Sequence, residues 1–361
     1  MRLFQNSAVY AAYLPRLNQL AAGKQTFRER LDVFLNDRFG ASHFLEPVLS
    51  GDPTAFFTNA DDTVLQQMWA AEHGMPTNSA PETILLAQIE DHRAEVFYNL
   101  DPMRFPSAFV RRLPGCVRRS IAWRAAPSPG ADFGAYDRVV CNFPTILKSY
   151  SERGWSAAFF SPAHDPVLDE YAANEERPVD ILFVGAYSRH HMRRAMLLER
   201  VAALQSQATL VMHLDQSRLV RFAESPLGRL LPLARHRRPL AVRSVSRPAL
   251  FGRDMYRALS RARIILNGAV DMAGTDRGNM RCFEAFGAGC ALLTDAGCYP
   301  EGMIAGETML TYDDATDAVE KLSGLLHDAP LTDRISRSGQ RMVRERYSKR
   351  AQLERFRELV N

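Results

Sequence analysis

The stretch Asp276–Thr294, DRGNMRCFEAFGAGCALLT, combines a helix, a turn of small residues and a buried strand. Apolar residues recur at helical spacing through Met280–Gly287, and Ala291–Thr294 is a short apolar, β-prone run. The glycine-rich turn between them is typical of a helix that feeds the next strand of a parallel sheet. The stretch therefore predicts one unit of an α/β domain.

The same alternation of strands and helices extends through the whole C-terminal half. An acidic segment, DEYAANEERPVD (Asp169–Asp180), has the composition of a linker between domains. Beyond it we predict strands at Asp180–Gly185, Ala208–His213 and Ile264–Asn267, helices at Arg193–Leu204 and Met255–Arg263, and helix from Asp317 onward.

The N-terminal half begins ambiguously and then alternates in the same way. Near-helical spacing runs through residues 25–49 and through Thr63–Glu72, and ETILLAQIEDH predicts a helix that precedes a strand at Ala94–Leu100. The alternation continues through SAFVRRL, SIAW, RVVCNF, TILKSYSERG and AAFF. The fold expected is α/β, with two Rossmann-like domains at 1–170 and 171–345 and a last helix at 346–361 near the domain junction.

Length and composition agree with two soluble globular domains. The chain has 361 residues, 46% of them hydrophobic and 24% charged, and a net charge of +4 that is too small to indicate nucleic-acid binding. The five cysteines lack the spacing of a zinc site, and we expect them to be reduced. Because no secretory or membrane-spanning segment is evident, the expected location is the cytoplasm.

Ligands of open parallel sheets bind beyond the carboxyl ends of the strands. One such end is Gly185, where the backbone can approach a pyrophosphate while Ser188 and Arg189 donate to its oxygens. A plain strand-to-helix turn with solvated arginines explains these residues equally well. Other strand ends are Asn267-Gly268 and the segment 294–297.

Glu284 is a carboxylate in an otherwise apolar helix. A buried carboxylate needs hydrogen bonds, which a sugar diol or backbone amides can supply. Arg281 lies three residues earlier on the same helical face and can pair with Glu284 instead. Both interpretations remain open at this point, with the ion pair slightly favoured.

The pattern N-x(n)-R-x-x-E-A-x-x-x-G-x-x-x-x-T, preceded by F-V-G, resembles the C-terminal domain of GT-B-fold glycosyltransferases of group 1 type. The likeness is greatest to the bacterial group related to the spore-maturation protein CgeB, and it extends to LQQMWAAEHG, ILLAQIEDHRAEVFYNLDP, YDRVVCNFPTILKSYSERGW and SPAHDP. The resemblance implies two Rossmann-like domains with parallel sheets that face a central cleft. The first would bind the acceptor, and the second would bind a nucleoside diphosphate sugar.

The resemblance also implies roles for individual residues. Glu284 would bind the donor ribose, while Arg281 or Arg189 and the Gly185 loop would stabilise the departing diphosphate. Asp276 precedes Glu284 by seven intervening residues, a place where many retaining members carry a glutamate. This shorter acid leaves open whether the enzyme retains or inverts. The full donor-site prediction is Gly185, Ser188, Arg189, Asn267, Asp276, Asn279, Arg281 and Glu284.

An inverting enzyme needs a general base from the N-terminal half. Asp101 and His164 follow predicted strands and lead the candidates, ahead of His43 and Asp165; Arg189 completes the predicted catalytic set. Each candidate base also has a structural explanation as a turn or packing residue.

No metal or cofactor is expected, because this fold stabilises the leaving diphosphate with arginine, lysine and helix dipoles. The nearest approach to a metal motif, Asp61-Asp62, is better explained as a helix N-cap. The leading hypothesis is a metal-independent, hexosyltransferase-like enzyme that moves a sugar to a glycan, lipid or protein acceptor. A sugar-nucleotide epimerase or hydrolase, or a non-catalytic glycan- or nucleotide-binding protein, is the alternative.

The stretch 229–247 is rich in arginine, with leucines interleaved. It can contact a lipid-linked or polyanionic acceptor, or the acidic inner face of a membrane. A solvated loop is the simpler explanation.

Overall fold

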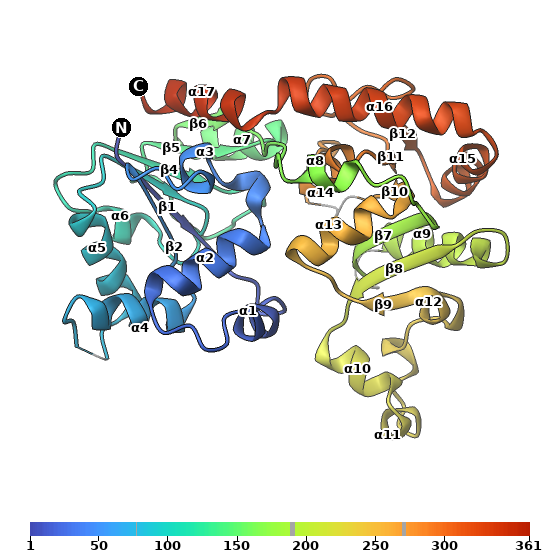
Figure 1. Cartoon of the computed structure of the whole chain (residues 1–361), viewed down its shortest axis with the longest axis horizontal. Helices are drawn as coiled ribbons and strands as arrows, with labels where there is room; N and C mark the ends of the chain where they lie inside the picture. Colours follow the sequence, from blue (N-terminus) through green and yellow to red (C-terminus); the bar gives the residue numbers. More distant parts are fainter. Residues whose placement is uncertain (77, 188–191, 269–271) are drawn as a thin grey trace. The chain divides into compact units, whose positions relative to one another are not determined.

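The computed structural model describes residues 1–76, 78–187, 192–268 and 272–361, in two compact units (Figure 1). The first unit contains Met1–Ala163 and Lys349–Asn361, and the second contains His164–Ser348. The corresponding expected boundaries were 170/171 and 345/346.

The first unit is built on a six-stranded parallel sheet with the order β2-β1-β3-β4-β5-β6. Every neighbouring pair is parallel, so helices must connect the strands across the faces. The strands are β1 (Leu3–Ser7), β2 (Ala55–Asn59), β3 (Val96–Asn99), β4 (Arg119–Trp123), β5 (Arg138–Cys141) and β6 (Ala157–Phe159).

Two helices of the first unit begin with side-chain caps. Thr26 and Glu29 form a capping box at the start of α2, and the Asp62 side chain caps α4 by accepting from the Leu65 amide. The helices are α1 (Leu14–Leu20), α2 (Phe27–Asp37), η1 (Ala41–His43), α3 (Glu46–Leu49), α4 (Thr63–Glu72), α5 (Pro81–Asp91), α6 (Ser107–Val110) and α7 (Pro144–Ser151).

The last helix, α17 (Lys349–Val360), returns to the first unit. Its Phe356 ring packs against Tyr98 and Phe160, with centroids 4.9 and 5.8 Å away. The buried Lys349 ammonium donates to the carbonyls of Ala41 and Phe44, each at 2.7 Å. These contacts explain why the chain leaves the second unit after Ser348.

The second unit also contains a six-stranded parallel sheet, with the order β12-β11-β10-β7-β8-β9. Numbered within the unit, this is the 6-5-4-1-2-3 order of the Rossmann fold, and the order reverses between β7 and β10. The strands are β7 (Val179–Ala186), β8 (Leu210–Asp215), β9 (Ser246–Pro248), β10 (Ala262–Leu266), β11 (Ala291–Asp295) and β12 (Leu310–Tyr312). The two expected parallel-sheet, Rossmann-like domains are confirmed.

Two apolar clusters separate the helices of the second unit into layers. Side chains from α9, α12 and α15 form one cluster, and side chains from α8, α13, α14 and α16 form the other. The helices are α8 (Leu168–Ala172), α9 (Met192–Ala202), η2 (Ala203–Ser206), α10 (Arg218–Glu224), α11 (Pro226–Arg229), η3 (Ala234–His236), α12 (Leu240–Val245), α13 (Gly252–Ser260), α14 (Met280–Gly287), α15 (Ala315–His327) and α16 (Ala329–Arg346).

The acidic segment expected to be a linker is instead part of the second unit. Tyr171 packs against the α13–α14 cluster, and the Arg177 guanidinium donates to the carbonyls of Ala262 and Ala288. Composition indicated a solvated connection here. The two anchoring side chains, one aromatic and one basic, fix the segment to the domain.

Candidate functional site

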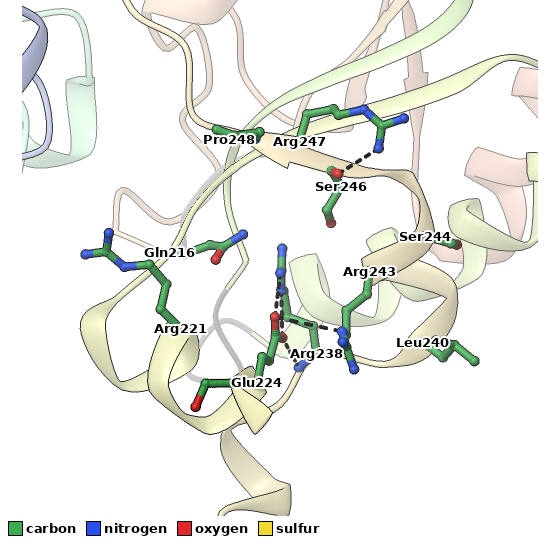
Figure 2. A pocket seen from close by; sticks show the side chains of 11 residues that line it. Gln216, Arg221, Glu224, Arg238, Leu240, Arg243, Ser244, Ser246, Arg247 and Pro248 are labelled. Atoms are coloured by element: carbon green, nitrogen blue, oxygen red, sulfur yellow. Dashed lines mark hydrogen bonds and ion pairs between the residues drawn. The ribbon is translucent and has the colours of Figure 1, made fainter. Parts of the chain in front are cut away.

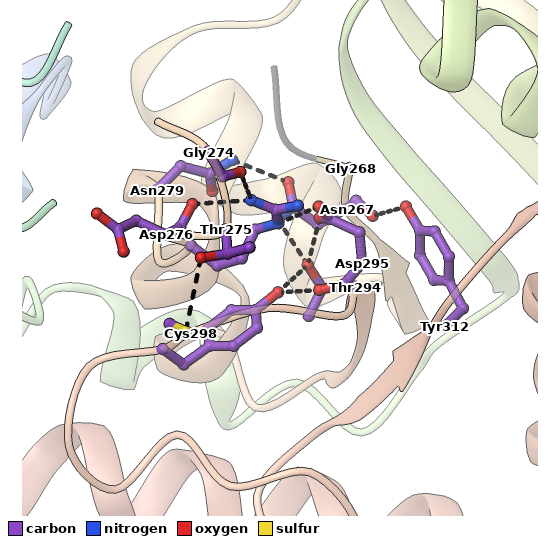
Figure 3. Close-up of polar contacts among 12 residues, drawn as sticks. Asn267, Gly268, Gly274, Thr275, Asp276, Asn279, Thr294, Asp295, Cys298 and Tyr312 are labelled. Carbon is purple, nitrogen blue, oxygen red and sulfur yellow. Dashed lines mark hydrogen bonds and ion pairs between the residues drawn. The ribbon is translucent and has the colours of Figure 1, made fainter. Parts of the chain in front are cut away.

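The carboxyl edge of the second sheet carries a buried network of polar side chains (Figure 3). Asn267 follows β10 and donates to Thr294 Oγ1 at 3.1 Å, while Asn279 Nδ2 donates to Asn267 Oδ1 at 3.3 Å. The Tyr312 hydroxyl donates to the Asn267 carbonyl at 2.8 Å, and the Tyr299 hydroxyl lies 2.9 Å from Thr294 Oγ1. The predicted residues Asn267 and Asn279 therefore lie together at the end of β10.

Helix α14 begins at this edge without a side-chain cap. Its N-cap residue, Asn279, has extended backbone but directs its amide to Asn267 rather than to the helix. Gly278 has a φ of 99°, which favours glycine at the entry to the helix. An uncapped helix start offers backbone N–H groups and a positive dipole end, which together favour an anion.

Glu284 is almost completely buried in the second turn of α14. Arg281 Nη1 donates to Glu284 Oε2 at 2.6 Å, so the ion pair expected from sequence is present. Burial raises the pKa of Glu284, and the Arg281 charge opposes that rise. Among the residues that the structure describes, none donates to the second oxygen, Oε1. A carboxylate oxygen that has no donor from the protein can accept from a ligand hydroxyl.

A pocket of about 300 Å³ opens along the same edge, among the ends of β10, β11 and β12 and the first turns of α9 and α15. The cations on its wall are Arg193, Arg194 and Arg277, and the acids are Asp295, Asp313 and Asp314. Arg277 pairs with Asp295, and Arg194 donates to the Gly268 carbonyl. The pocket is at the lower end of the size range of ligand sites. Its arginines suit phosphate groups.

Sequence reasoning did not select Arg193, Arg194 or Arg277 for the donor site. Arg193 and Arg194 lie in the first turn of α9, the helix that follows β7, where a diphosphate-binding side chain is expected in this type of sheet. Two adjacent arginines shortly after a predicted strand could have identified Arg193 and Arg194. Arg277 could not be identified in this way, because its carboxylate partner, Asp295, is 18 positions away in the next strand.

Four of the predicted donor residues do not join this network in the described structure. The Asp276 carboxylate points away from the Asn267 network in Figure 3. Gly185 lies inside β7 rather than at its end, because pairing with β8 continues through Ala186 and Asp215. Ser188 and Arg189 fall outside the described residues.

The first unit brings two acids together at the carboxyl edge of its sheet. Asp101 follows β3 and lies 3.3 Å from Arg104, and burial raises its pKa. Asp61 follows β2 and accepts from the Val9 amide at 2.9 Å; burial is the main cause that raises its pKa to about 6, with a smaller contribution from the charge of Asp101. Sequence reasoning treated Asp61-Asp62 as a cap. Only Asp62 has that role.

The other candidate bases are packed into the protein. His164 belongs to the second unit rather than to the N-terminal half, lies against Gly287 of α14, and contacts Asp169 Oδ1 at 2.9 Å. Burial lowers the pKa of His164. Asp165 is fully buried and accepts from the Tyr256 hydroxyl at 3.1 Å.

His43 is also enclosed. Its ring lies 4.6 Å from that of Trp123, and burial is the main cause that lowers its pKa to about 3. These environments favour structural roles for His43, His164 and Asp165.

Within the described ranges, no group of three or more histidine, cysteine, aspartate or glutamate side chains could hold a metal ion. All five cysteines are free thiols. None of the helices in the described part of the chain has the length and apolar content of a membrane span.

Comparisons with known proteins relate the second unit to sugar transfer. Residues 193–358 match the family model described as "Glycosyl transferase-like". No curated protein sequence matches the chain. The match covers α9, the pocket wall and α14, so these parts of the C-terminal half are similar to a glycosyl transferase-like domain.

Solved structures similar to this chain share its fold over nearly the full length. A glycosyltransferase from Rickettsia africae has a TM-score of 0.57 at 10% identity, with 99% of this chain and 97% of that chain covered. HepE from Anabaena, solved with UDP and glucose, has a TM-score of 0.59 at 11% identity over 100% and 99%. Sucrose-phosphate synthase from Thermosynechococcus elongatus gives 0.53 at 11% identity over 99% and 97%. The two Rossmann-like units are those of the GT-B fold.

Proposed function

We propose that the protein transfers a sugar, in the manner of a hexosyltransferase, from a nucleoside diphosphate donor to a glycan, lipid or protein acceptor without a metal ion. The observation that carries this proposal is Glu284, a buried carboxylate whose Oε1 has no donor among the described residues. It lies in a helix that starts uncapped at the sheet edge, within the segment matched by the family model. A carboxylate beside a helix start suits the two parts of a nucleotide, its ribose diol and its phosphates.

The donor would bind along the carboxyl edge of the second sheet. Glu284 would accept from the ribose hydroxyls, and the amides at the start of α14 would donate to the diphosphate. Arg194 and Arg277, in the pocket, would then stabilise the charge that develops as the diphosphate departs. Ser188 and Arg189 remain predicted contributors to the same group of cations.

The acceptor side is assigned to the first unit. Asp101 is the preferred general base, because it is partly exposed and its pKa is raised toward the pH at which a base works best. The charge of Asp101 in turn helps to raise the pKa of Asp61, so Asp61 takes up its proton first as the pH falls. This assignment fits an inverting transfer, in which the base takes the proton of the attacking hydroxyl.

UDP-sugars are the first donors to test, because structures of Anabaena HepE contain UDP and UDP-glucose. A place in the bacterial CgeB-related group and a cytoplasmic location are part of the same proposal. They rest on the sequence resemblance alone.

The test is calorimetric titration with UDP, GDP and ADP, followed by incubation with the corresponding donor sugars. We expect one nucleoside diphosphate to bind in the micromolar range and its sugar to be transferred to an added acceptor. A product that forms from the donor sugar without any acceptor would favour the epimerase or hydrolase alternative. Failure of all nucleotides to bind would overturn the proposal.

A further inference from the structure

The connection between β8 and β9 carries a large excess of positive charge. Residues 217–247, here called the basic insertion, contain eight arginines and one glutamate. Since the whole chain has a net charge of +4, the rest of the chain is net negative. Figure 1 shows α10 and α11 of this insertion projecting away from the sheet of the second unit. The sugar-transfer proposal uses none of these residues.

Internal contacts hold the basic insertion in a defined shape. Arg238 makes a bidentate pair with Glu224, at 2.9 and 2.6 Å. The Arg237 guanidinium donates to the carbonyls of Ala223 and Gly228, at 3.1 and 2.9 Å, and so joins α10 to α11. Arg237 and Arg238 therefore stabilise the structure of the insertion, which is folded and is not a solvated, irregular loop.

The basic insertion forms most of an open surface hollow of about 480 Å³, the arginine pocket, with an excess of positive charge (Figure 2). Four arginines line it, namely Arg221, Arg238, Arg243 and Arg247, and Glu224 is its single acid. Arg243 lies 3.9 Å from Glu224, which Arg238 already holds, and Arg247 donates to the Ser246 carbonyl at 3.0 Å. Arg221 has no ion-pair partner among the described residues. Repulsion between these guanidinium groups is relieved by a bound anion.

Large apolar side chains project into solvent on the same segment. Leu227, Leu230 and Leu240 are 64%, 84% and 78% exposed, and Leu240 lies on the rim of the pocket. The same segment also exposes Leu219, Phe222 and Leu231. So many exposed leucines on one short segment indicate an apolar binding surface rather than a solvated face.

We propose that the basic insertion docks on an anionic phospholipid surface, with a lipid phosphate in the arginine pocket and the exposed leucines in the apolar boundary of the bilayer. Arginine recognises phosphate geometry, and leucine or phenylalanine beside basic residues is typical of elements that lie in a membrane interface. A nucleic acid would engage the arginines but would leave the leucines exposed. This inference does not depend on sugar transfer.

Co-sedimentation with vesicles tests the inference. The wild-type protein should bind vesicles of equimolar phosphatidylcholine and phosphatidylglycerol, and it should bind phosphatidylcholine alone at least about tenfold more weakly. Arg243→Gln/Arg247→Gln should lose most binding to the anionic vesicles. Leu227→Ser/Leu230→Ser should also bind them more weakly. The matched control, Arg337→Gln/Arg350→Gln, removes the same charge from exposed positions elsewhere and should bind like the wild type.

Nucleotide titration and melting temperature show whether each variant is folded, and they keep this test separate from that of sugar transfer. Equal binding to both vesicle types, or pocket and control variants that behave alike, would overturn the inference. Stabilisation by inorganic phosphate without vesicle binding would also overturn it, because the pocket would then serve a soluble anion. Binding of duplex RNA without vesicle binding would exclude a membrane role in the same way.

Discussion

Arg281 donates to Glu284 within a single turn of α14, with Nη1 2.6 Å from Oε2. The Glu284 side chain is 3% exposed to solvent, and the Arg281 side chain is 17% exposed. Arg281 thus satisfies one carboxylate oxygen, and no described residue donates to the other. The ion pair and the donor site are therefore compatible interpretations of the same two residues.

The Glu284→Gln substitution distinguishes a ligand contact from a purely structural pair. Glutamine keeps the size of the side chain but loses the charge that strengthens hydrogen bonds from ribose hydroxyls. We expect the nucleotide Kd to rise by roughly tenfold or more, since hydrogen bonds to charged groups contribute about 1.5–3 kcal/mol. Calorimetry on the folded variant measures this. A lower melting temperature together with an unaltered Kd would leave Glu284 with a structural role only.

The close packing of α14 against the His164 segment gives a stability prediction. A Cβ at Gly287 would lie 2.7 Å from His164 Nδ1 and 2.7 Å from Leu168 Cδ1, both in a buried environment. Gly287→Ala should therefore destabilise the second unit by about 1–3 kcal/mol, as overpacking does.

Gly324→Ala is the matched control, because Gly324 lies within α15 with no atom near its missing Cβ. This change should stabilise the protein by about 0.5–1 kcal/mol through helix propensity. Differential scanning calorimetry should therefore show melting temperatures that shift in opposite directions. Equal shifts would mean that Gly287 is not tightly packed.

Activity is expected to survive chelation, because arginines and the α14 helix start supply the positive charge at the proposed donor site. Departure of the diphosphate needs several kcal/mol of charge stabilisation, which a metal ion supplies in many enzymes. Here the protein would supply it, so transfer rates measured with and without EDTA should differ by less than about twofold. A complete loss that added Mg²⁺ restores would show that a metal supplies it.

The order of strands and helices in the second unit could largely be predicted from its sequence, because most of its strands are short apolar runs between amphipathic helices. The expected helix at Met280–Gly287 coincides with α14, and the expected strand at Asp180–Gly185 lies within β7. Strand β12, with only three residues, was not expected. Three residues are too few to show the alternation of apolar and polar side chains that indicates a strand.

The first strand was missed for a different reason. Strand β1 has the sequence LFQNS, and its Gln5, Asn6 and Ser7 side chains are buried. Such a run has no apolar pattern, yet tertiary hydrogen bonds satisfy it: Asn6 Nδ2 donates to Asn99 Oδ1 at 2.8 Å, and Asn6 Oδ1 accepts from the Ala60 amide at 3.0 Å. Partners so distant in sequence cannot be inferred from local spacing.

The same limit applies to the candidate site. Glu284 could be singled out because a lone acid in an apolar helix is anomalous in any sequence. The environment of Asp61, by contrast, depends on the Val9 amide and on Asp101, which come from other parts of the chain. His164 looked like a strand-end base until its contact with Gly287 placed it in the second unit.

Burial of Asp61 should make the stability of the protein depend on pH. Its folded pKa of about 6 exceeds the ordinary value of 3.8, so the folded state holds the proton more tightly than the unfolded state does. Stability is then lost as pH rises from about 4 to about 6, by at most ~3 kcal/mol. Asp61→Asn removes this pH-dependent loss of stability, because asparagine does not ionise. Its melting temperature relative to wild type should therefore be higher at pH 7.5 than at pH 4.5, and a constant difference would mean that Asp61 is solvated.

The pH dependence of transfer should separate the roles of the two acids. If Asp101 is the base, Asp101→Asn should lower kcat by about 10²–10⁴-fold at every pH, the usual contribution of general base catalysis. Asp61→Asn should remain active and should leave the acid limb of kcat/KM in place, because Asp61, whose pKa of about 6 is raised in part by the charge of Asp101, is already protonated where Asp101 titrates. A limb that moves in Asp61→Asn would mean that Asp61 is itself the titrating acid. Stopped assays with a saturating donor sugar across pH 4.5–8 measure both quantities, and Asp101→Asn with wild-type kcat would exclude Asp101 as the base.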